Sequence, residues 1–399
     1  MAGRARALHG YNTGGLSRGL RRFIFHLAAF CALPAVLLAA GEAVLQGSGE
    51  LWPLDRVFAY QAAHADALYL RAVDQVFYAY KYRGILLKRP TVLVAGSSRT
   101  MKFRAGMFGE RAGSFYNAGG LLNSVRDVVE LSDRMPADPA PALLVLGVDL
   151  WWFNARVAPT YSLAAEIDKD PGRTFDEHVV ALRWLAWNPS LFGRELVSTI
   201  TSPRPNLIGI EARETGNGFR TDGSHASSLP VPATRDEWQF VDRERPPIIE
   251  RVSTATAGFL PTEGISEARL RALDAALERF DGRRVLVVGY LPPFSSAVLN
   301  ALRTDPRHSR LWSEFERHVP ELFRRHGFPV IDASDLTRFA MDDRVMIDGV
   351  HADETFHLHV VKSMLADVRV SAALPGADVA VARALASPRT NYWRADLGS

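Results

Sequence analysis

The chain has 399 residues, of which 47% are hydrophobic and 23% are charged. This length and composition exclude a disordered or fibrous protein and predict one large or two ordinary globular domains. The net charge of +3 arises in residues 1–22, which hold five arginines and no acid; the remaining chain has 42 of the 47 basic side chains against all 44 acidic ones, a net charge of −2. We therefore expect no nucleic-acid partner, because the body has no excess of positive charge.

An uncharged apolar segment follows the basic arm of residues 1–22. Its core, FIFHLAAFCALPAVLLAA at 23–40, would form a helix about 27 Å long, enough to cross a bilayer. Arginines at one end favour a single-pass signal-anchor at 23–45 over a core helix. A cleaved signal peptide stays an alternative, since LLAAGEA offers small residues at a cleavage distance. The positive-inside rule places the N-terminus in the cytoplasm, the anchor in the inner (cytoplasmic) membrane and the body in the periplasm or extracellular space.

Cysteine and histidine usage limits the chemistry of this body. The only cysteine, Cys31, lies inside the apolar segment, so the exported part has neither a disulfide nor a thiol nucleophile. His351, His357 and His359 lie close together in the sequence, but no second cluster of histidines and carboxylates accompanies them. We expect no metal and no cofactor.

After a linker or helical lead-in at 46–89, the chain alternates between strand and helix patterns. Short β-branched apolar runs, as in buried strands of a parallel sheet, occur at 91–96, 142–150, 283–291 and 328–334. Amphipathic helical patterns at 267–280 and 310–327 precede the last two runs. This alternation predicts an α/β domain over 90–368 with a C-terminal tail at 369–399.

The middle segment, 151–265, interrupts that alternation. It contains Trp151, Trp152, Trp184, Trp187 and Trp238, and its joints are rich in proline, glycine and serine. We expect an insertion that forms a cap on the sheet. Its tryptophans either stack on sugar rings or are buried beneath the cap.

A candidate nucleophile and a candidate base lie at two predicted loops. Gly96-Ser97-Ser98 ends the first strand, and the carboxyl end of a parallel strand exposes a serine hydroxyl beside backbone N–H groups. In MIDGVHADE at 346–354, Asp348 precedes His351 by three residues and can accept a hydrogen bond from the imidazole. The combination predicts a catalytic set of Ser98, His351 and Asp348. The alternative for the Asp-His pair is a surface turn.

These motifs resemble the SGNH (GDSL-type) hydrolase family, in particular its membrane-anchored exported branch of acyl-transfer proteins of cell-surface polymers. Gly96-Ser97-Ser98 is similar to the Gly-Asp-Ser motif, with Ser98 as the nucleophile and Ser97 in place of aspartate. Asp348-Gly349-Val350-His351 matches the final Asp-x-x-His block. The resemblance covers roughly 90–368 and implies a three-layer αβα, flavodoxin-like parallel sheet of the SGNH-hydrolase type.

The resemblance also implies an oxyanion hole. The segment FYNAGG is similar to the second family block, so the N–H groups of Gly119 or Gly120 would join that of Ser98, and Asn117 would contact substrate. Arg99, next to the serine, would bind an anionic substrate; a solvated arginine is the alternative.

The third family block, Gly-x-Asn, differs here. The strand ends Gly147-Val148-Asp149, and an ionised Asp149 cannot donate a hydrogen bond to an oxyanion. Asn154 is a candidate replacement, although it lies five residues later. Asp149 would otherwise have a structural role such as capping.

The expected activity is that of an exported serine esterase or O-acyltransferase. His351 would take the Ser98 proton, and the serine-bound acyl group would pass to water or to a hydroxyl of a surface or extracellular polysaccharide. The alternative is a non-catalytic SGNH-like protein that binds glycan or acts as a scaffold for a multi-spanning membrane O-acyltransferase. The departure at Asp149 favours this alternative.

Overall fold

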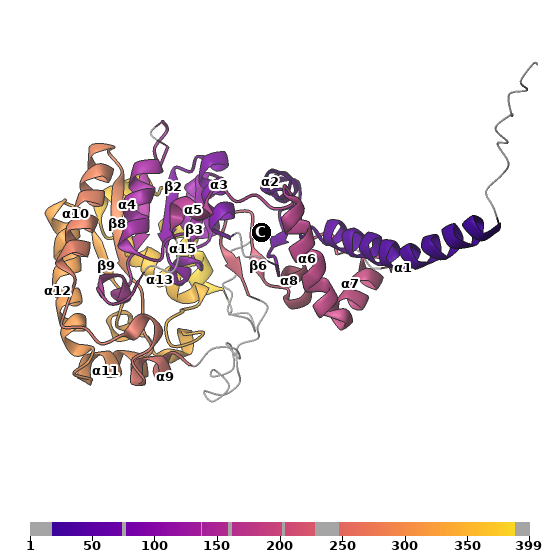
Figure 1. Ribbon diagram of the computed structural model, residues 1–399. Coiled ribbons are helices and arrows are strands. Elements are labelled where there is room, and N and C mark those ends of the chain that lie inside the picture. Colours follow the sequence, from indigo (N-terminus) through magenta and orange to yellow (C-terminus); the bar gives the residue numbers. More distant parts are fainter. Residues whose placement is uncertain are drawn as a thin grey trace, which may run out of the picture.

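A five-stranded parallel sheet forms the centre of the larger lobe in the computed structural model, which describes residues 18–73, 77–136, 138–158, 162–201, 204–227 and 247–387 (Figure 1). The strand order is β3-β2-β4-β8-β9, and every pairing is parallel. The strands are β2 (Val92–Gly96), β3 (Phe115–Gly119), β4 (Leu143–Gly147), β8 (Leu286–Leu291) and β9 (Val330–Asp332). The predicted α/β class with a parallel sheet is therefore confirmed. Four strands coincide with the predicted apolar runs; β3 escaped prediction because Asn117 and Gly119 interrupt its apolar pattern.

Both faces of this sheet are covered, because successive strand residues point to opposite sides. Leu93 and Ala95 belong to the core beneath one helical layer, whereas Val92 and Val94 belong to the core beneath the other. The first layer contains α3 (Phe77–Lys88), α4 (Val125–Arg134), α10 (Glu267–Gly282), α11 (Ser296–Thr304) and α12 (Ser309–Arg325). The second contains η2 (Ala105–Ser114), α13 (Glu354–Met364), α14 (Val368–Ala373) and α15 (Ala377–Ala386). Short helical turns connect these elements: η1 (Ser98–Thr100), η3 (Leu150–Phe153), α5 (Leu163–Glu166), η6 (Leu336–Phe339) and η7 (Asp343–Val345).

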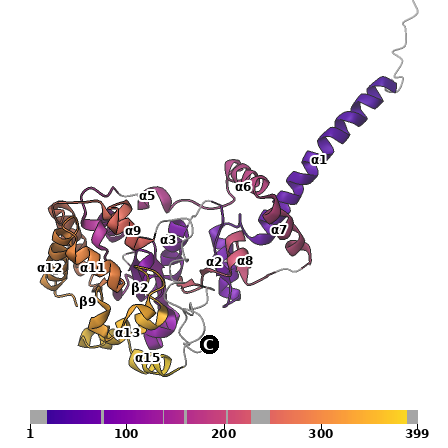
Figure 2. The same ribbon diagram turned by 90° about the horizontal axis from the view of Figure 1, so that it is seen from below.

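The smaller lobe surrounds the end of a long N-terminal helix, α1 (Arg18–Ser48) (Figures 1 and 2). An 18-residue window of α1 has a mean hydropathy of 2.3 and is not buried, so the helix is long and apolar enough to cross a membrane. Its last turns are buried in the lobe through Gly41, Val44 and Leu45. The rest of the lobe contains α2 (Leu54–Ala63), α6 (Phe175–Trp187), α7 (Pro189–Thr201), α8 (Ile210–Thr215) and a sheet of order β5-β1-β6-β7, built from β5 (Leu207–Ile208), β1 (Leu68–Tyr69), β6 (Gly218–Phe219) and β7 (His225–Ala226).

Two expected boundaries differ in the structure. Segment 151–265 does not form one cap, because α6 and α7 pack against α1 in the smaller lobe. Among its described residues, those beside the predicted site lie near the two ends of the segment, at Trp151, Val157 and Ala158 and at α9 (Ile248–Ser253) with η5 (Ala257–Phe259). The predicted tail begins with two packed helices, since α14 and α15 bury apolar side chains against the second layer. Trp238 lies outside the described residues.

Candidate active site

Ser98 lies at the carboxyl end of β2, next to the point where the strand order changes direction between β2 and β4. Such a point is where ligands bind in open parallel sheets. Ser97 caps the turn that follows, and its Oγ accepts a hydrogen bond of 3.3 Å from Arg99 N–H. The Ser97 side chain is therefore buried in the turn, whereas Ser98 is exposed.

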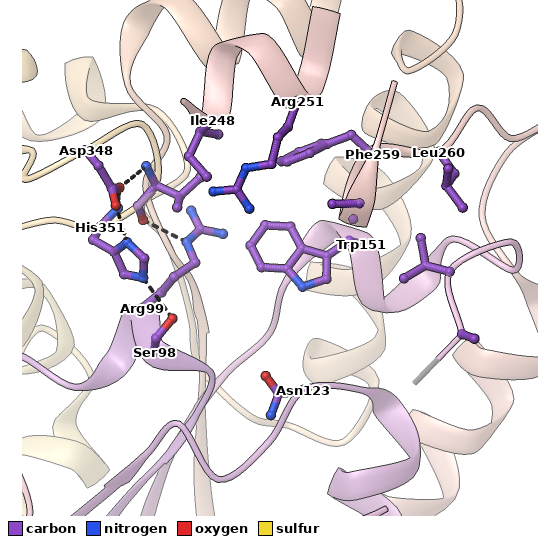
Figure 3. A pocket seen from close by; sticks show the side chains of 15 residues that line it. Ser98, Arg99, Asn123, Trp151, Ile248, Arg251, Phe259, Leu260, Asp348 and His351 are labelled. Carbon is purple, nitrogen blue, oxygen red and sulfur yellow. Dashed lines mark hydrogen bonds and ion pairs between the residues drawn. The ribbon is translucent and has the colours of Figure 1, made fainter. Parts of the chain in front are cut away.

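Ser98, His351 and Asp348 form one hydrogen-bonded chain (Figure 3). Ser98 Oγ lies 2.8 Å from His351 Nε2, and His351 Nδ1 lies 2.7 Å from Asp348 Oδ2. The other carboxylate oxygen, Oδ1, accepts the N–H groups of Val350 at 2.8 Å and His351 at 2.7 Å. Burial raises the pKa of Asp348, but the His351 charge and these hydrogen bonds outweigh it and lower this pKa to about 2. An ionised Asp348 can only accept, so it places the imidazole proton on Nδ1 and leaves Nε2 as a base facing the serine.

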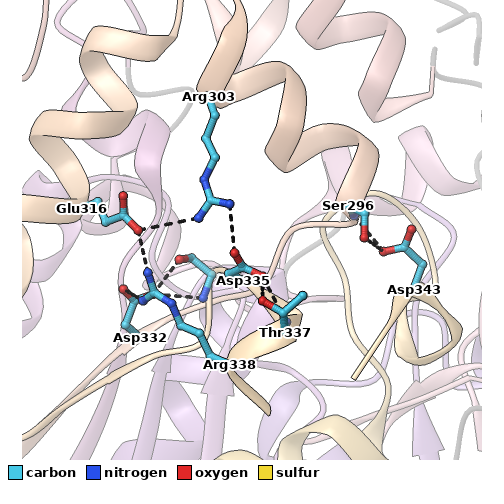
Figure 4. A network of polar contacts seen from close by, with 9 residues as sticks. Ser296, Arg303, Glu316, Asp332, Asp335, Thr337, Arg338 and Asp343 are labelled. Atoms are coloured by element: carbon cyan, nitrogen blue, oxygen red, sulfur yellow. Dashed lines mark hydrogen bonds and ion pairs between the residues drawn. The ribbon is translucent and has the colours of Figure 1, made fainter. Parts of the chain in front are cut away.

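The loop that carries Asp348 is fastened to the helix after β8. Asp343 Oδ1 accepts hydrogen bonds from Ser296 N–H at 2.7 Å and from Ser296 Oγ at 3.0 Å (Figure 4). Ser295 N–H donates to Gly349 O at 3.0 Å. Gly349 itself packs so closely that an added Cβ would lie 2.8 Å from Cβ of Ile248. These contacts fix the position of the Asp-x-x-His turn from both sides.

A network of ion pairs at the end of β9 holds the preceding part of this loop (Figure 4). Arg338 pairs with Asp332 and with Glu316, the latter at 2.6 Å. Arg303 pairs with Asp335 at 2.9 Å. These side chains are partly exposed, so the ion pairs add little to the free energy of unfolding. Their main effect is to hold β9, α11 and α12 in position relative to one another.

The sequence left open that Arg99 is solvated, but the structure shows it buried, with only 2% of its surface exposed. Its Nη1 pairs with Asp149 Oδ1 at 2.9 Å, its Nε donates to Val350 O at 2.9 Å, and its Nη2 donates to Pro293 O. The guanidinium carbon also lies 4.2 Å from the Phe294 ring centroid. Burial lowers the pKa of Arg99, and the Asp149 charge opposes that shift.

Asp149, which departs from the family pattern, therefore has a partner. It is 1% exposed, and its negative charge balances the buried guanidinium of the residue that follows Ser98. Asp149 does not face outward to repel an oxyanion, and it caps no helix through its side chain. Asp149 thus has a structural role, but it is that of a counter-ion and not the expected capping.

Three of the four residues expected to supply the oxyanion hole donate to other acceptors. Gly119 N–H donates to Asn117 Oδ1 at 2.6 Å, and Gly120 N–H donates to Gly96 O at 2.9 Å. Asn154 is buried and donates to Leu260 O. The Gly119 and Gly120 N–H groups and one N–H of Asn154 are therefore engaged within the protein. For the Ser98 N–H, no acceptor is found among the described residues.

Asn117 also has a structural position instead of the expected contact with substrate. It is fully buried, and its Nδ2 donates to Thr100 O at 2.9 Å and to Phe103 O at 2.8 Å. These bonds tie β3 to the turn that carries Ser98. Gly119 is required here because an added Cβ would lie 2.8 Å from Met101 N.

Asn123 is a pocket residue that the sequence reasoning missed. Its side chain lines the same cleft as Ser98 (Figure 3), and its Nδ2 donates to Tyr78 Oη at 2.9 Å. A carboxamide nitrogen has two N–H groups, so Asn123 keeps a second donor beyond this bond. The available signal was its position six residues after Asn117, in the loop that follows β3 at the carboxyl edge of the sheet.

The cleft above the serine has a volume of about 490 Å³. Trp151 and Phe259 form its aromatic wall, with ring centroids 5.8 Å apart, and Arg251 enters from α9 (Figure 3). Of the other expected tryptophans, Trp152 is buried, Trp184 packs in the smaller lobe and Trp187 is 73% exposed. Only Trp151 among these four lines the cleft.

The histidines near the predicted base serve other contacts. His357 is buried between two carbonyl oxygens, with Nδ1 at 2.7 Å from Asp353 O and Nε2 at 3.2 Å from Arg99 O. Burial lowers the pKa of His357 to about 4, so this ring is neutral near pH 7. In the part of the chain that the structure describes, no group of three or more His, Cys, Asp or Glu side chains has an arrangement suited to a metal ion.

The fold and the site together define an α/β domain with a Ser-His-Asp hydrogen-bond chain at the carboxyl edge of a parallel sheet. No protein-family model matches the chain, and no curated protein matches it in a sequence search.

Proposed function

We propose that the chain is an exported serine esterase or O-acyltransferase that acts on acyl esters of a cell-surface or extracellular polysaccharide. The observation that carries the proposal is the chain of short hydrogen bonds, 2.8 Å from Ser98 to His351 and 2.7 Å from His351 to Asp348. The strand order β3-β2-β4-β8-β9 reads 2-1-3-4-5 when the strands are numbered along the chain, which is the flavodoxin-like order. This order supports an SGNH-type αβα fold for the larger lobe.

The chemistry follows from the hydrogen-bond chain. His351 Nε2 removes the Ser98 proton as Oγ attacks the acyl carbonyl, and Asp348 stabilises the imidazolium that forms. When the tetrahedral intermediate collapses, His351 gives the proton to the departing alcohol and the acyl group stays on Ser98. Water or a sugar hydroxyl then loses its proton to His351 and takes the acyl group, which restores the serine.

The developing oxyanion needs donors, and the geometry supports a set different from that of the family. Ser98 N–H has no acceptor among the described residues, and Asn123 lines the same cleft with a carboxamide whose Nδ2 donates one of its two N–H groups to Tyr78. Asn123 would thus supply the carboxamide donor to the oxyanion that the asparagine of the Gly-x-Asn block supplies in SGNH hydrolases.

The remaining features support a glycan substrate outside the cytoplasm. The aromatic face of Trp151 in an open cleft suits a sugar ring. The arginines at the start of α1 support a cytoplasmic N-terminus by the positive-inside rule, and the site would then lie on the other side of the membrane.

A second candidate is a non-catalytic glycan-binding or scaffolding partner of a membrane O-acyltransferase. The observation that favours it is the engagement of the Gly119 and Gly120 N–H groups and of Asp149 in internal contacts, which reduces the oxyanion hole to fewer donors.

A fluorophosphonate probe tests the proposal, because it reacts covalently with an activated serine. Purified wild type should be labelled, Ser98→Ala should not, and Ser97→Ala should retain labelling because its hydroxyl acts only as a turn cap. Equal labelling of wild type and Ser98→Ala would refute the nucleophile. An unlabelled wild type that still binds acetylated polysaccharide would favour the second candidate.

A further inference from the structure

Apolar side chains are exposed along one side of α6, in the smaller lobe. Phe175 is 81% exposed, Val179 44%, Val180 53% and Trp187 73%. Phe175, Val179 and Trp187 are separated by multiples of four residues, and Val180 adjoins them, so they form one stripe on the helix. Such a stripe on a protein surface marks a binding face.

Two contacts show at which point along α1 the helix α6 lies. His178 Nδ1 lies 3.0 Å from Glu42 Oε2, and an added Cβ at Gly41 would lie 2.5 Å from a methyl group of Leu182. Residues 23–41 contain no Asp, Glu, Lys or Arg and extend about 28 Å as a helix, close to the thickness of a bilayer core. Glu42 is the first charge beyond that stretch, so α6 meets α1 where the apolar stretch ends.

The orientation of α6 also suits a position at the membrane surface. Figure 1 shows α6 crossing α1 and not continuing beside it into the apolar stretch. If α1 spans the membrane, a helix that runs across it is inclined toward the plane of the bilayer, which is the orientation of an interfacial helix. Trp187 ends α6 with the guanidinium carbon of Arg183 5.9 Å from its ring centroid, a combination of aromatic ring and cation that suits the headgroup region.

From these observations we infer that α6 is an interfacial helix, whose stripe of Phe175, Val179, Val180 and Trp187 inserts into the lipid surface around α1. Interfacial helices bury their apolar face about 5–10 Å into the boundary between headgroups and acyl chains. The occupant of the stripe is lipid because α1 holds it against a bilayer in any molecule whose α1 spans the membrane. Besides the span of α1, this contact of α6 with lipid would fix the tilt of the smaller lobe relative to the bilayer. The inference does not depend on the proposed esterase activity.

Fluorescence quenching in nanodiscs tests the inference with the full-length protein. After Cys31→Ser removes the native thiol, Val180→Cys carries an environment-sensitive dye, and the discs contain lipids spin-labelled near the headgroup. The matched control is Val379→Cys in α15, which is 56% exposed and lies far from α1 in Figure 2. Val179→Cys is the second position if Val180→Cys does not fold.

We expect blue-shifted emission at position 180 and quenching by spin-labelled lipid several-fold stronger than at position 379. A dye at 180 that emits as in water and is quenched no more than at 379 would overturn the inference. In that case the stripe of the purified protein would face water and not lipid. Fluorophosphonate labelling of the same samples is measured separately, so a loss of lipid contact at α6 is distinguishable from a loss of reactivity at Ser98.

Discussion

Replacing Asp149 by asparagine restores the residue type of the family's third block, yet we expect it to destabilise the protein. Arg99 and Asp149 are 2% and 1% exposed, and their charged atoms lie 2.9 Å apart. Asp149→Asn removes the negative charge and leaves a buried guanidinium without a counter-ion. Breaking a buried pair from one side costs about 3–5 kcal/mol of unfolding free energy, since the desolvated charge that remains is uncompensated.

The same change should also disturb the site. Arg99 Nε holds Val350 O, the carbonyl next to His351, so a displaced guanidinium releases the turn that carries the base. Urea unfolding of Asp149→Asn gives the stability change, and fluorophosphonate labelling gives the effect on Ser98. The matched control is Asp55→Asn, whose pair with Arg83 has the same 2.9 Å distance but a 57% exposed carboxylate. That exposed pair should be worth less than about 1 kcal/mol.

A double-variant cycle separates the pair from its surroundings. Arg99→Met with Asp149→Asn should cost less than the sum of the single changes, because the second substitution removes the unpaired charge left by the first. A cost for Asp149→Asn as small as that of Asp55→Asn, or strict additivity in the cycle, would refute the counter-ion role.

The other predictions concern the reaction, a buried lysine and topology. His351→Ala should lower kcat/KM for a small aryl acetate nearly as far as the triple replacement of Ser98, His351 and Asp348, with Asp348→Asn costing less; a folded His351→Ala within a few-fold of wild type would remove the triad. Asn123→Ala should lower kcat about 100-fold or more with little change in urea midpoint if it donates to the oxyanion, whereas unchanged kcat would exclude that role. Burial lowers the pKa of Lys81 from 10.5 to about 7. The unfolded chain then binds the extra proton between these pH values, so wild-type stability should rise from pH 7 to about 10.5, and a Lys81→Met variant should show a flatter profile in urea titrations at each pH. A reporter active only outside the cytoplasm should work when fused after residue 60, and a mature N-terminus near Gly41 would instead show a cleaved signal.

Local sequence patterns were sufficient for four of the five strands and for one half of the hydrogen-bond chain. Buried parallel strands are apolar on both faces, so β2, β4, β8 and β9 could be located from short apolar runs. Asp348 and His351 are three residues apart, so their contact needs only a turn. The strand β3 could not be located this way, because Asn117 is buried for its hydrogen bonds to the serine turn and not for its hydrophobicity.

The contacts that escaped prediction join residues far apart in the sequence. The pairing of Arg99 with Asp149 spans 50 residues and depends on β2 and β4 being neighbours. No local pattern distinguishes a buried arginine from a solvated one, because its environment is built entirely by other segments. The placement of α6 against α1 is of the same kind, since it depends on a contact between His178 and Glu42 across 136 residues.

Arg99 links the departure at Asp149 to the rest of the site. Arg99 follows Ser98 in the turn after β2. Its guanidinium reaches the end of β4 through Asp149, the loop after β8 through Pro293 O, and the loop of Asp348 and His351 through Val350 O. An asparagine at position 149 would leave this charge unbalanced, so a buried arginine after the serine requires an acid there. In the proposed mechanism a carboxamide donor would then come from another strand end, and Asn123, which follows β3 beside β2 and lines the cleft, occupies such a position. On this reasoning the difference from the Gly-x-Asn block of the family that the sequence resembles follows from Arg99 and does not by itself argue against the proposed catalysis.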